Sequence, residues 1–377
     1  MRIGFDAKRA FFNHSGLGNY SRTLISQLCT IFPDNEYFLF SPKENNLFGN
    51  FPPKNTKLVT PAKFPFKQFP SIWRSAFMGR DIAEHKIQIF HGLSNELPQD
   101  IRKSKALSIV TIHDLIFLRY PNLYKRSDRA IYKSKTIRSC NQADAIIAIS
   151  EQTKSDIIRF FDIKPEKIHV VYQGCNPIYY EKANGWISTI VRGKYSLPPK
   201  YLLYVGTIEE RKNLLQLIKA KHEYNIPLPL VVIGRATPYF EKVKEYISQN
   251  KIQDIIFLKN IRLEDLPSIY QLAEVFIYPS SFEGFGIPIL EAMNSGVPVI
   301  AGKGSSMEEA GGQHSIYVNP SHIDEIAGAI NQVINDPNLK KRMIDEGYKQ
   351  AMLFREERTS NEMMNLYQKL LKDAGRY

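Results

Sequence analysis

Two acidic residues, Glu283 and Glu291, bracket a stretch with the sequence EGFGIPILE. Gly284 and Gly286 carry no Cβ atom, so the backbone there can turn tightly and bring N–H groups close to a ligand. Pro288 suits the first turn of a helix, and the start of a helix attracts an anion. Carboxylates accept hydrogen bonds from sugar hydroxyls. Together these residues predict a site for a sugar joined to a diphosphate, although each acid taken singly also fits an ordinary turn or first helical turn.

Two cations follow another strand-like run. The sequence YLLYVGTIEERKNLLQL predicts a strand, a turn at Gly206 and a helix that starts near Arg211 and Lys212. Cations at the start of a helix oppose its dipole, which indicates an anionic ligand. Lys212 would neutralise phosphate charge, and Arg211 could bind a phosphate through two hydrogen bonds. A surface pair without a ligand is the alternative.

A third candidate lies directly after the apolar run that ends at Ile112, where His113 and Asp114 follow each other. Ligands of open α/β sheets bind beyond such strand ends. A histidine donates or accepts protons near neutral pH, and Asp114 could orient its ring. The alternative is a structural histidine with no part in binding.

The stretch SGLGNY suggests a dinucleotide-binding turn, but the pattern fails at two points. Ser21 stands where the third glycine would be, and Ser41 rather than an acid ends the second strand-like run. A redox cofactor is therefore not predicted. We expect Gly16 and Gly18 to form a flexible turn that faces a cleft between domains.

Composition and missing motifs exclude several kinds of protein. With 377 residues, 43% of them hydrophobic, the chain exceeds what one core usually organises and is not disordered. Cys29, Cys140 and Cys175 are too far apart for a disulfide framework. The sequence has no phosphate loop, H-E-x-x-H, G-x-S-x-G or zinc-spaced cluster, so we predict neither a metal nor a cofactor. We expect a cytoplasmic protein, because we find neither a secretory signal nor an apolar run long enough to span a membrane.

Strand-like runs alternate with helical periodicity, which is typical of parallel sheets covered by helices. We therefore predict the α/β class with two Rossmann-like domains. The stretch 174–199 is rich in Gly, Pro and Asn, so we place the boundary there, between domains at 1–184 and 185–377. Periodicity over 336–371 predicts C-terminal helices that could pack back on the first domain. Strands are predicted at 2–6, 37–40, 87–90, 107–112, 145–149, 168–171, 201–205, 230–233, 255–258, 275–278 and 297–300.

Positive charge is concentrated in the first half of the chain. Residues 1–184 contain 27 Lys and Arg against 16 Asp and Glu (net +11), and the remainder contains 23 against 22 (net +1). Ten of the basic residues lie between Ile101 and Cys140, with only Asp114 and Asp128 as acids. Such a surface would attract nucleic acid, an anionic membrane, or a phosphorylated small molecule or lipid. A solvated helix face is the alternative.

At these motifs the sequence resembles glycosyltransferase family 4 over nearly its whole length. The matching stretches are SGLGNY, HDLIFLRYP, IAISEQTK, VVYQGCNP, VGTIEERKN and the Glu283–Glu291 pair, which has the E-x7-E spacing of that family. The resemblance implies a retaining, metal-independent enzyme of the GT-B fold. In that fold, two Rossmann-like domains have parallel sheets that face a central cleft. The N-terminal domain would bind the acceptor and the C-terminal domain the nucleotide sugar.

The resemblance also implies roles for individual residues. Gly16 and Gly18 would lie by the donor phosphates, and His113 would contact the transferred sugar. Arg211 and Lys212 would bind the diphosphate. Since charge develops on that leaving group, these cations and backbone N–H groups would be the main catalytic device.

In the same resemblance Glu283 would face the sugar and Glu291 the ribose of the nucleotide. The donor would also be bound by the turn of Gly284, Phe285 and Gly286.

The chain departs from the family pattern at two places. Family members often carry Arg where this chain has Thr207, and commonly Pro where it has Glu308. The next position matches, so Glu309 is carried over as a support for the ribose or the phosphates.

The reaction implied is transfer of a hexose from a nucleotide diphosphate to an acceptor hydroxyl. We expect GDP-mannose as donor, because the stretch from His113 to Pro121 most resembles that of mannosyltransferases. The expected acceptor is a glycan or lipid-linked glycan at the inner membrane face, in cell-surface polysaccharide synthesis, with an anionic membrane surface as a further partner. Two alternatives are a nucleotide-sugar epimerase on the same fold and a basic nucleic-acid-binding protein. The second alternative does not account for the Glu283–Glu291 pair, so no nucleic acid is expected.

Overall fold

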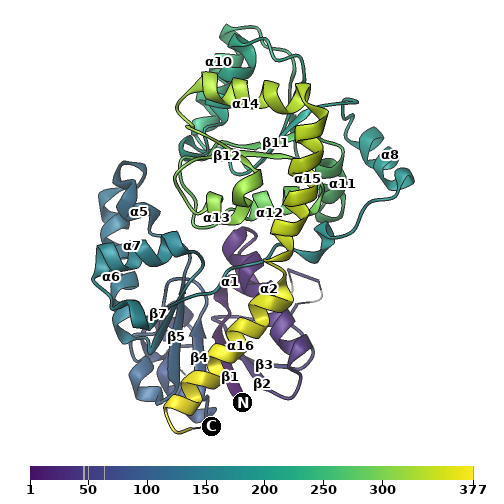
Figure 1. The fold of residues 1–377 in the computed structure, drawn as a ribbon. Coiled ribbons are helices and arrows are strands. Elements are labelled where there is room, and N and C mark those ends of the chain that lie inside the picture. Colours follow the sequence, from purple (N-terminus) through teal and green to yellow (C-terminus); the bar gives the residue numbers. More distant parts are fainter. Residues whose placement is uncertain (46, 50, 63, 377) are drawn as a thin grey trace. The chain divides into compact units, whose positions relative to one another are not determined.

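The computed structural model describes residues 1–45, 47–49, 51–62 and 64–376. The chain forms two compact units (Figure 1). The first contains Met1–Gln173 together with the final helix, α16 (Glu356–Asp373), and the second is Gly174–Arg355. The boundary between the units falls after Gln173, whereas the sequence predicts a boundary after Asn184.

The first unit is built on a parallel sheet of seven described strands in the order β3-β2-β1-β4-β5-β6-β7. The chain moves outward from β1 to β3 and then crosses to β4 on the other side of β1. The strand order thus reverses between β1 and β4, and ligands of such sheets bind beyond the carboxyl ends of the strands at this switch point. The strands are β1 (Arg2–Asp6), β2 (Glu36–Phe40), β3 (Thr56–Val59), β4 (Ile89–Gly92), β5 (Leu107–Ile112), β6 (Ala145–Ala148) and β7 (Ile168–Val170).

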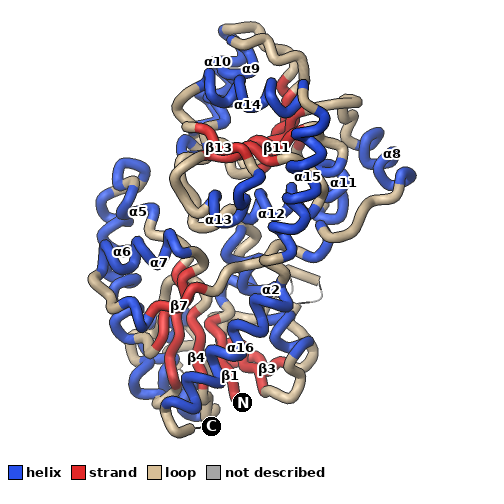
Figure 2. Tube along the Cα trace, in the orientation of Figure 1, coloured by secondary structure: helices blue, strands red, loops and turns tan. Residues whose placement is uncertain are grey.

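Side chains from the two faces of this sheet pack into separate cores. Ile3 and Phe5 belong to the core that includes residues of α2 and α16. Gly4 leaves room on the other face for the Phe40 ring, since a Cβ atom there would lie 2.9 Å from it. Helices cover both faces (Figure 2). Besides α16, they are α1 (Lys8–Phe12), α2 (Gly16–Ile31), α3 (Pro70–Ile72), α4 (Met78–Glu84), α5 (Ile116–Arg119), α6 (Arg126–Gln142) and α7 (Glu151–Phe161).

The second unit has a parallel sheet of six described strands in the order β10-β9-β8-β11-β12-β13. Its switch point lies between β8 and β11. The strands are β8 (Leu202–Val205), β9 (Leu230–Ile233), β10 (Ile255–Leu258), β11 (Val275–Tyr278), β12 (Val299–Gly302) and β13 (Ile316–Val318). The helices are α8 (Gly185–Lys194), α9 (Leu214–Glu223), α10 (Tyr239–Gln249), α11 (Leu266–Gln271), α12 (Ile287–Asn294), α13 (Met307–Gly311), α14 (Ile323–Asn335) and α15 (Pro337–Met352).

The predicted α/β class with two parallel sheets is confirmed, and every predicted strand overlaps an observed one. The prediction missed β3 and β13, which lie at sheet edges and pair with one neighbour each. Their sequences, TKLV and IYV, are short and only partly buried. A run that contains two polar residues, or that has only three residues, carries too little apolar pattern to be recognised, whereas the edge strand β10 has the apolar sequence IIFL and was predicted.

Candidate functional site

The switch point of the second sheet brings predicted site residues together. Arg211 and Lys212 lie in a 3-10 turn (Glu210–Lys212) after β8, and Glu283 follows β11. Because β8 and β11 are parallel neighbours, their carboxyl ends meet at the same edge. The Ser281 N–H donates to the Arg211 carbonyl oxygen at 2.8 Å, which joins the two loops.

The carboxylate of Glu283 holds both cations. Its Oε1 atom lies 2.8 Å from Nη1 of Arg211 and 3.5 Å from Nζ of Lys212. The same oxygen accepts hydrogen bonds from the hydroxyls of Tyr278 and Ser280, each at 2.8 Å. Lys212 also donates to the Tyr278 hydroxyl at 2.7 Å. One carboxylate therefore sets the positions of two cations.

Further contacts fix these two cations within the protein. The Arg211 guanidinium, whose side chain is 11% exposed, also bonds Glu209 and the carbonyl oxygen of Phe282. A Cβ atom on Gly206 would lie 3.3 Å from Cδ of Lys212, so the Lys212 side chain packs directly against this glycine. Contacts within the protein thus hold both positive charges in position.

Glu283 remains ionised in this setting. Burial alone would raise its pKa, but Lys212 and Arg211, with hydrogen bonds from Tyr278 and Ser280, lower the pKa to about 2. The charge of a carboxylate is favoured by nearby cations and by donors that bond its ionised form.

Glu291, in α12, lies among tyrosines instead. The Tyr270 hydroxyl donates to its Oε2 atom at 2.9 Å. Burial raises the pKa of Glu291 to about 7, and hydrogen bonds from Tyr270 and Tyr179 and the charge of Lys212 lower it only in part. Lys212 therefore acts electrostatically on both acids of the pair.

The glycine-rich turn between the acids is tightly packed. Gly286 caps α12 with φ +116°, a conformation that favours glycine. The Ser306 hydroxyl donates to the carbonyl oxygens of Glu283 at 2.7 Å and Phe285 at 3.3 Å. The Phe285 side chain is 2% exposed and packs edge-on against Phe354. Only the backbone of Phe285 is therefore placed for the predicted contact with a donor.

Two further predicted residues lie next to this turn. Gly284 directly follows Glu283, and Glu309 lies in α13, which packs against α12. The carbonyl oxygen of Glu309 accepts a hydrogen bond from Gln350 Nε2 at 3.1 Å. The Glu309 side chain is partly exposed.

His113 lies in the first unit, just beyond β5. Its Nε2 atom is 2.9 Å from the Leu93 carbonyl oxygen, so Nε2 carries the proton and donates. Its backbone N–H donates to Asn95 Oδ1 at 2.9 Å, and its ring meets that of Tyr20 edge-on. Burial lowers the pKa of His113 to about 4, so the ring is neutral at pH 7. The Asp114 carboxylate accepts a hydrogen bond from the Ile116 N–H at 3.0 Å.

Gly16 and Gly18 lie in the first turn of α2, so the expectation of a flexible turn is wrong. The Gly18 N–H donates to the Ser15 carbonyl oxygen at 2.9 Å. A Cβ atom on Gly18 would lie 1.9 Å from the Asn13 carbonyl oxygen, so the close approach of two backbone segments requires glycine there. A Cβ atom on Gly16 would meet nothing within 4 Å.

The structure therefore gathers Arg211, Lys212 and Glu283 in the second unit, with Glu291 under the influence of Lys212. Gly16, Gly18 and His113 belong to the first unit. Sequence reasoning missed the tyrosines that bond the acids, because a tyrosine in an apolar run is usually a core residue. These are Tyr179, Tyr270 and Tyr278.

Comparison with known proteins gives the same two-part division. Residues 15–178 match the family model described as Glycosyltransferase Family 4, and residues 191–350 match the one described as Glycosyl transferases group 1. O-antigen chain mannosyltransferase B of Escherichia coli is 28% identical, over 98% of this chain and 100% of that protein.

Two solved structures share the fold. Sucrose-phosphate synthase from Thermosynechococcus elongatus aligns over 98% of this chain and 99% of its own, with a TM-score of 0.79 and 19% identity. HepE of Anabaena, solved in complex with UDP, aligns over 98% and 100% of the two chains, with a TM-score of 0.77 and 16% identity. In the described part of the chain, no helix combines the length and the apolar character needed to cross a membrane.

Proposed function

The chain belongs to glycosyltransferase family 4 and is a glycosyltransferase, and we propose that it moves a hexose from a nucleotide diphosphate to a hydroxyl group of a glycan acceptor. The donor that we propose is GDP-mannose. The similarity of this chain to a bacterial O-antigen mannosyltransferase supports this choice. HepE, which shares the fold, was solved with UDP, which supports a nucleoside diphosphate as the bound part of the donor.

The observation that carries the proposal is the pair of cations held by Glu283 at the switch point of the second sheet. A departing diphosphate gains negative charge in the transition state, and preorganised cations stabilise it without having to move. In this scheme Arg211 and Lys212 neutralise the diphosphate, so the reaction needs no metal ion. Activity that persists in EDTA would support this part.

Binding of the diphosphate would change one contact in this cluster. Arg211, Lys212, Glu209 and Glu283 sum to zero charge, and Glu209 is the more exposed acid, with 36% of its side chain accessible. We expect a phosphate oxygen to replace Glu209 as the partner of Arg211. Glu283 would stay in place to orient both cations, and Glu291 would receive the ribose.

The test is a screen of nucleotide sugars for thermal stabilisation of the chain and of two variants. A donor at one hundred times its Kd stabilises the folded state by about 2.7 kcal/mol. We expect GDP-mannose to do so in the chain and in Lys200→Ala, a control whose side chain is 71% exposed. Lys212→Ala should abolish the effect. Equal stabilisation of Lys212→Ala would contradict the proposed site.

Turnover separates this function from an epimerase. A transferase consumes the donor quickly only when an acceptor is present, whereas an epimerase needs none. We propose that the acceptor is a lipid-linked glycan and that transfer retains the anomeric configuration. Mannose release that is independent of any added acceptor would contradict the proposal.

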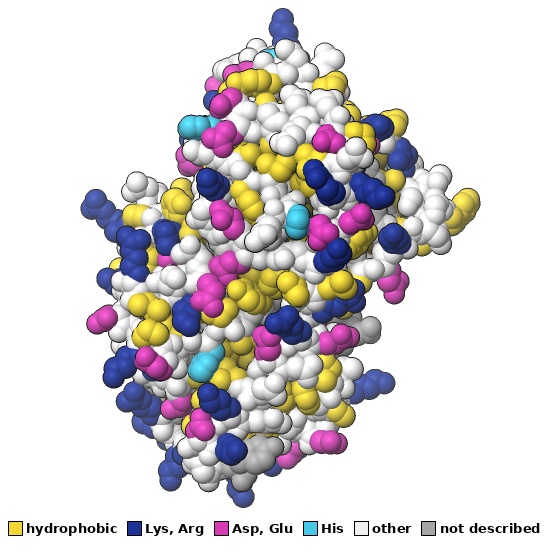
Figure 3. Space-filling view, viewed as in Figure 1, with side chains coloured by type: hydrophobic (Ala, Val, Ile, Leu, Met, Phe, Trp, Pro, Cys, Tyr) yellow, Lys and Arg dark blue, Asp and Glu magenta, His cyan; other side chains and the backbone are white. Residues whose placement is uncertain are grey.

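We further propose that α6 and the loop before it bind an anionic membrane. Apolar side chains are exposed there beside the basic residues, with Leu123 at 41%, Ile131 at 51% and Tyr132 at 46% exposure. Cations next to exposed apolar groups suit an anionic interface. In the view of Figure 3, Lys and Arg side chains are frequent along the margin of the first unit.

Charge reversal tests this part. Exchanging Lys125, Arg126, Arg129 and Lys133 for Glu should abolish binding to vesicles that contain anionic lipid. The control exchanges Lys341 and Arg342 for Glu, and both residues are exposed in α15 of the second unit. This control should leave vesicle binding unchanged. Full binding by the first variant would refute the membrane surface.

A further inference from the structure

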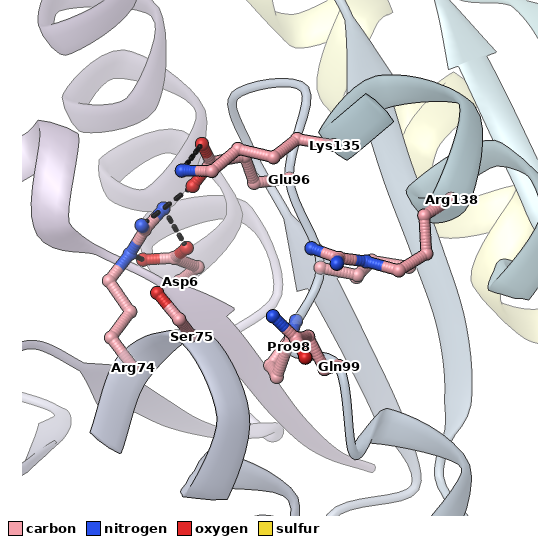
Figure 4. A pocket seen from close by; sticks show the side chains of 9 residues that line it. Asp6, Arg74, Ser75, Glu96, Pro98, Gln99, Lys135 and Arg138 are labelled. Carbon is pink, nitrogen blue, oxygen red and sulfur yellow. Dashed lines mark hydrogen bonds and ion pairs between the residues drawn. The ribbon is translucent and has the colours of Figure 1, made fainter. Parts of the chain in front are cut away.

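A cavity of about 60 Å³ lies in the first unit at its own switch point (Figure 4). Asp6 is the last residue of β1, and Glu96 follows β4, so the cavity lies where the strand order reverses. Arg74 and Lys135 also line it, the latter from α6. The second sheet places the candidate donor site at the equivalent position.

Both acids of this cavity are already neutralised. Arg74 lies 2.6 Å from Asp6 Oδ2 and 2.7 Å from Glu96 Oε2, and its Nε donates to Asp6 Oδ1 at 3.0 Å. Lys135 Nζ lies 3.1 Å from Glu96 Oε1. All four carboxylate oxygens therefore have a cationic partner, and two acids balance two cations.

A third cation, Arg138, also lines the cavity, in addition to the two that neutralise its acids. The guanidinium of Arg138, from the next turn of α6, points into the cavity (Figure 4). Its Nε atom is buried and has no hydrogen-bond partner among the residues that the structure describes. Buried polar groups without partners are rare, and a guanidinium cannot lose its charge to relieve the cost.

The surroundings add polar groups and positive potential. Ser75 and Gln99 line the same cavity. A further cation, Lys8, lies near Arg74. Burial lowers the pKa of Lys8 most, and the positive charge of Arg74 lowers it further. The cavity thus has a net positive charge and room for one small polar group, not for a whole sugar ring.

We propose that this cavity binds an oxyanion of the acceptor, a phosphate or a carboxylate, and that Arg138 is the cation that receives it. The inference rests on the proposed glycosyl transfer, because it assigns the oxyanion to the acceptor of that reaction. The oxyanion could belong to a phosphate of a lipid carrier or to the carboxylate of an acidic sugar. Both present oxygen atoms that a guanidinium binds through two parallel hydrogen bonds.

Calorimetric titration of the full chain tests the proposal. Inorganic phosphate, glucuronate and neutral glucose are titrated at constant ionic strength, with GDP present to fill the nucleotide site. The variants are Arg138→Gln and the control Arg159→Gln, which removes the same charge from an exposed position of α7 in the same unit. Arg138→Gln should weaken oxyanion binding about tenfold or more, and Arg159→Gln by less than about twofold. Arg138→Lys, which keeps the charge but not the two parallel hydrogen bonds, should retain only part of the affinity.

The result also separates the two sources of the oxyanion. Tighter binding of phosphate supports a lipid phosphate, and tighter binding of glucuronate supports an acidic sugar. Equal losses in Arg138→Gln and Arg159→Gln, or binding of glucose as tight as that of both anions, would overturn the proposal. Failure of GDP to bind would count against the proposed donor and not against the oxyanion site. The comparison of the two variants would still test whether Arg138 binds the oxyanion.

Discussion

Glu283 and Glu291 are two largely buried acids whose pKa values move in opposite directions. Glu283 lies against two cations, which lower its pKa to about 2. Glu291 lies among tyrosine hydroxyls, which only partly offset the effect of burial, so its pKa rises to about 7. The cost of burying a carboxylate is thus met by ion pairing in one case and by protonation in the other.

For Glu283, the change to test is Glu283→Gln. Its folded pKa lies below the ordinary value of 4.5, so the ionised form stabilises the fold above pH 4.5, and this stabilisation is lost as the pH falls toward 2. The variant should lower the free energy of unfolding at pH 7 by about 3 kcal/mol. Urea unfolding measures the difference in the free energy of unfolding between the chain and the variant, and this difference should become smaller below pH 4.5. The control is Glu210→Gln, which changes an exposed neighbouring acid. A difference that is the same at pH 7 and pH 3 would contradict the ion pairing.

For Glu291, the sign is reversed. Its folded pKa lies above 4.5, so ionisation in the folded state costs stability as the pH rises from 4.5 through about 7. Glu291→Gln is neutral at every pH and escapes this cost. The variant should therefore have a Tm similar to that of the chain at pH 5 and a higher Tm at pH 8.5, measured by thermal denaturation. A Tm difference that does not change with pH would show that Glu291 ionises as readily as an exposed acid.

Among the elements, α16 joins the first unit although it comes last in the chain. Met363, Met364 and Leu371 are buried in the core that also contains Ile3 and Phe5 of β1. The Tyr367 hydroxyl lies 2.6 Å from Nδ1 of the buried His91 in β4. The helix therefore covers one face of a sheet whose strands lie far from it in sequence.

This packing predicts different costs for two methionine substitutions. Met363→Ala should lower the free energy of unfolding by about 2–5 kcal/mol, because it leaves a cavity in that core. The matched control is Met352→Ala at the end of α15, where the side chain is 53% exposed, with an expected change below about 0.5 kcal/mol. Chemical denaturation measures both. Similar losses would show that α16 is not buried as described.

At the scale of the whole molecule, each unit has its own core and one of the two tryptophans. Trp73 is 1% exposed in the first unit, and Trp186 is 73% exposed in the second. Units with separate cores can unfold in separate transitions.

The tryptophans provide the measurement. In Trp186→Phe, fluorescence reports only on Trp73 and hence on the first unit, whereas far-UV circular dichroism reports on both. We expect the two signals to follow different curves in urea, since the units are stabilised by different cores. GDP-mannose should shift the part of the dichroism curve that belongs to the second unit. Coincident curves would show that the chain unfolds as one cooperative body.

The sequence by itself determined the α/β class, the doubled parallel sheets and the two acids and two cations proposed for the candidate site, which are Arg211, Lys212, Glu283 and Glu291. Central strands such as β5 and β11 are buried on both faces, so their apolar runs are recognisable from local pattern alone. The E-x7-E spacing and the adjacent Arg211 and Lys212 are likewise local features. The edge strands β3 and β13 escaped prediction, because TKLV contains two polar residues and IYV has only three residues.

The tertiary structure alone decided how those residues act. Which acid is paired with cations depends on strand order, because β8 and β11 are neighbours although some seventy residues separate them along the chain. The same holds for Arg138, whose Nε has no hydrogen-bond partner in the described part of the chain, because Arg74, from a distant segment, neutralises Asp6 and Glu96. Burial and charge pairing arise between residues far apart in sequence, and for that reason no local pattern predicts them.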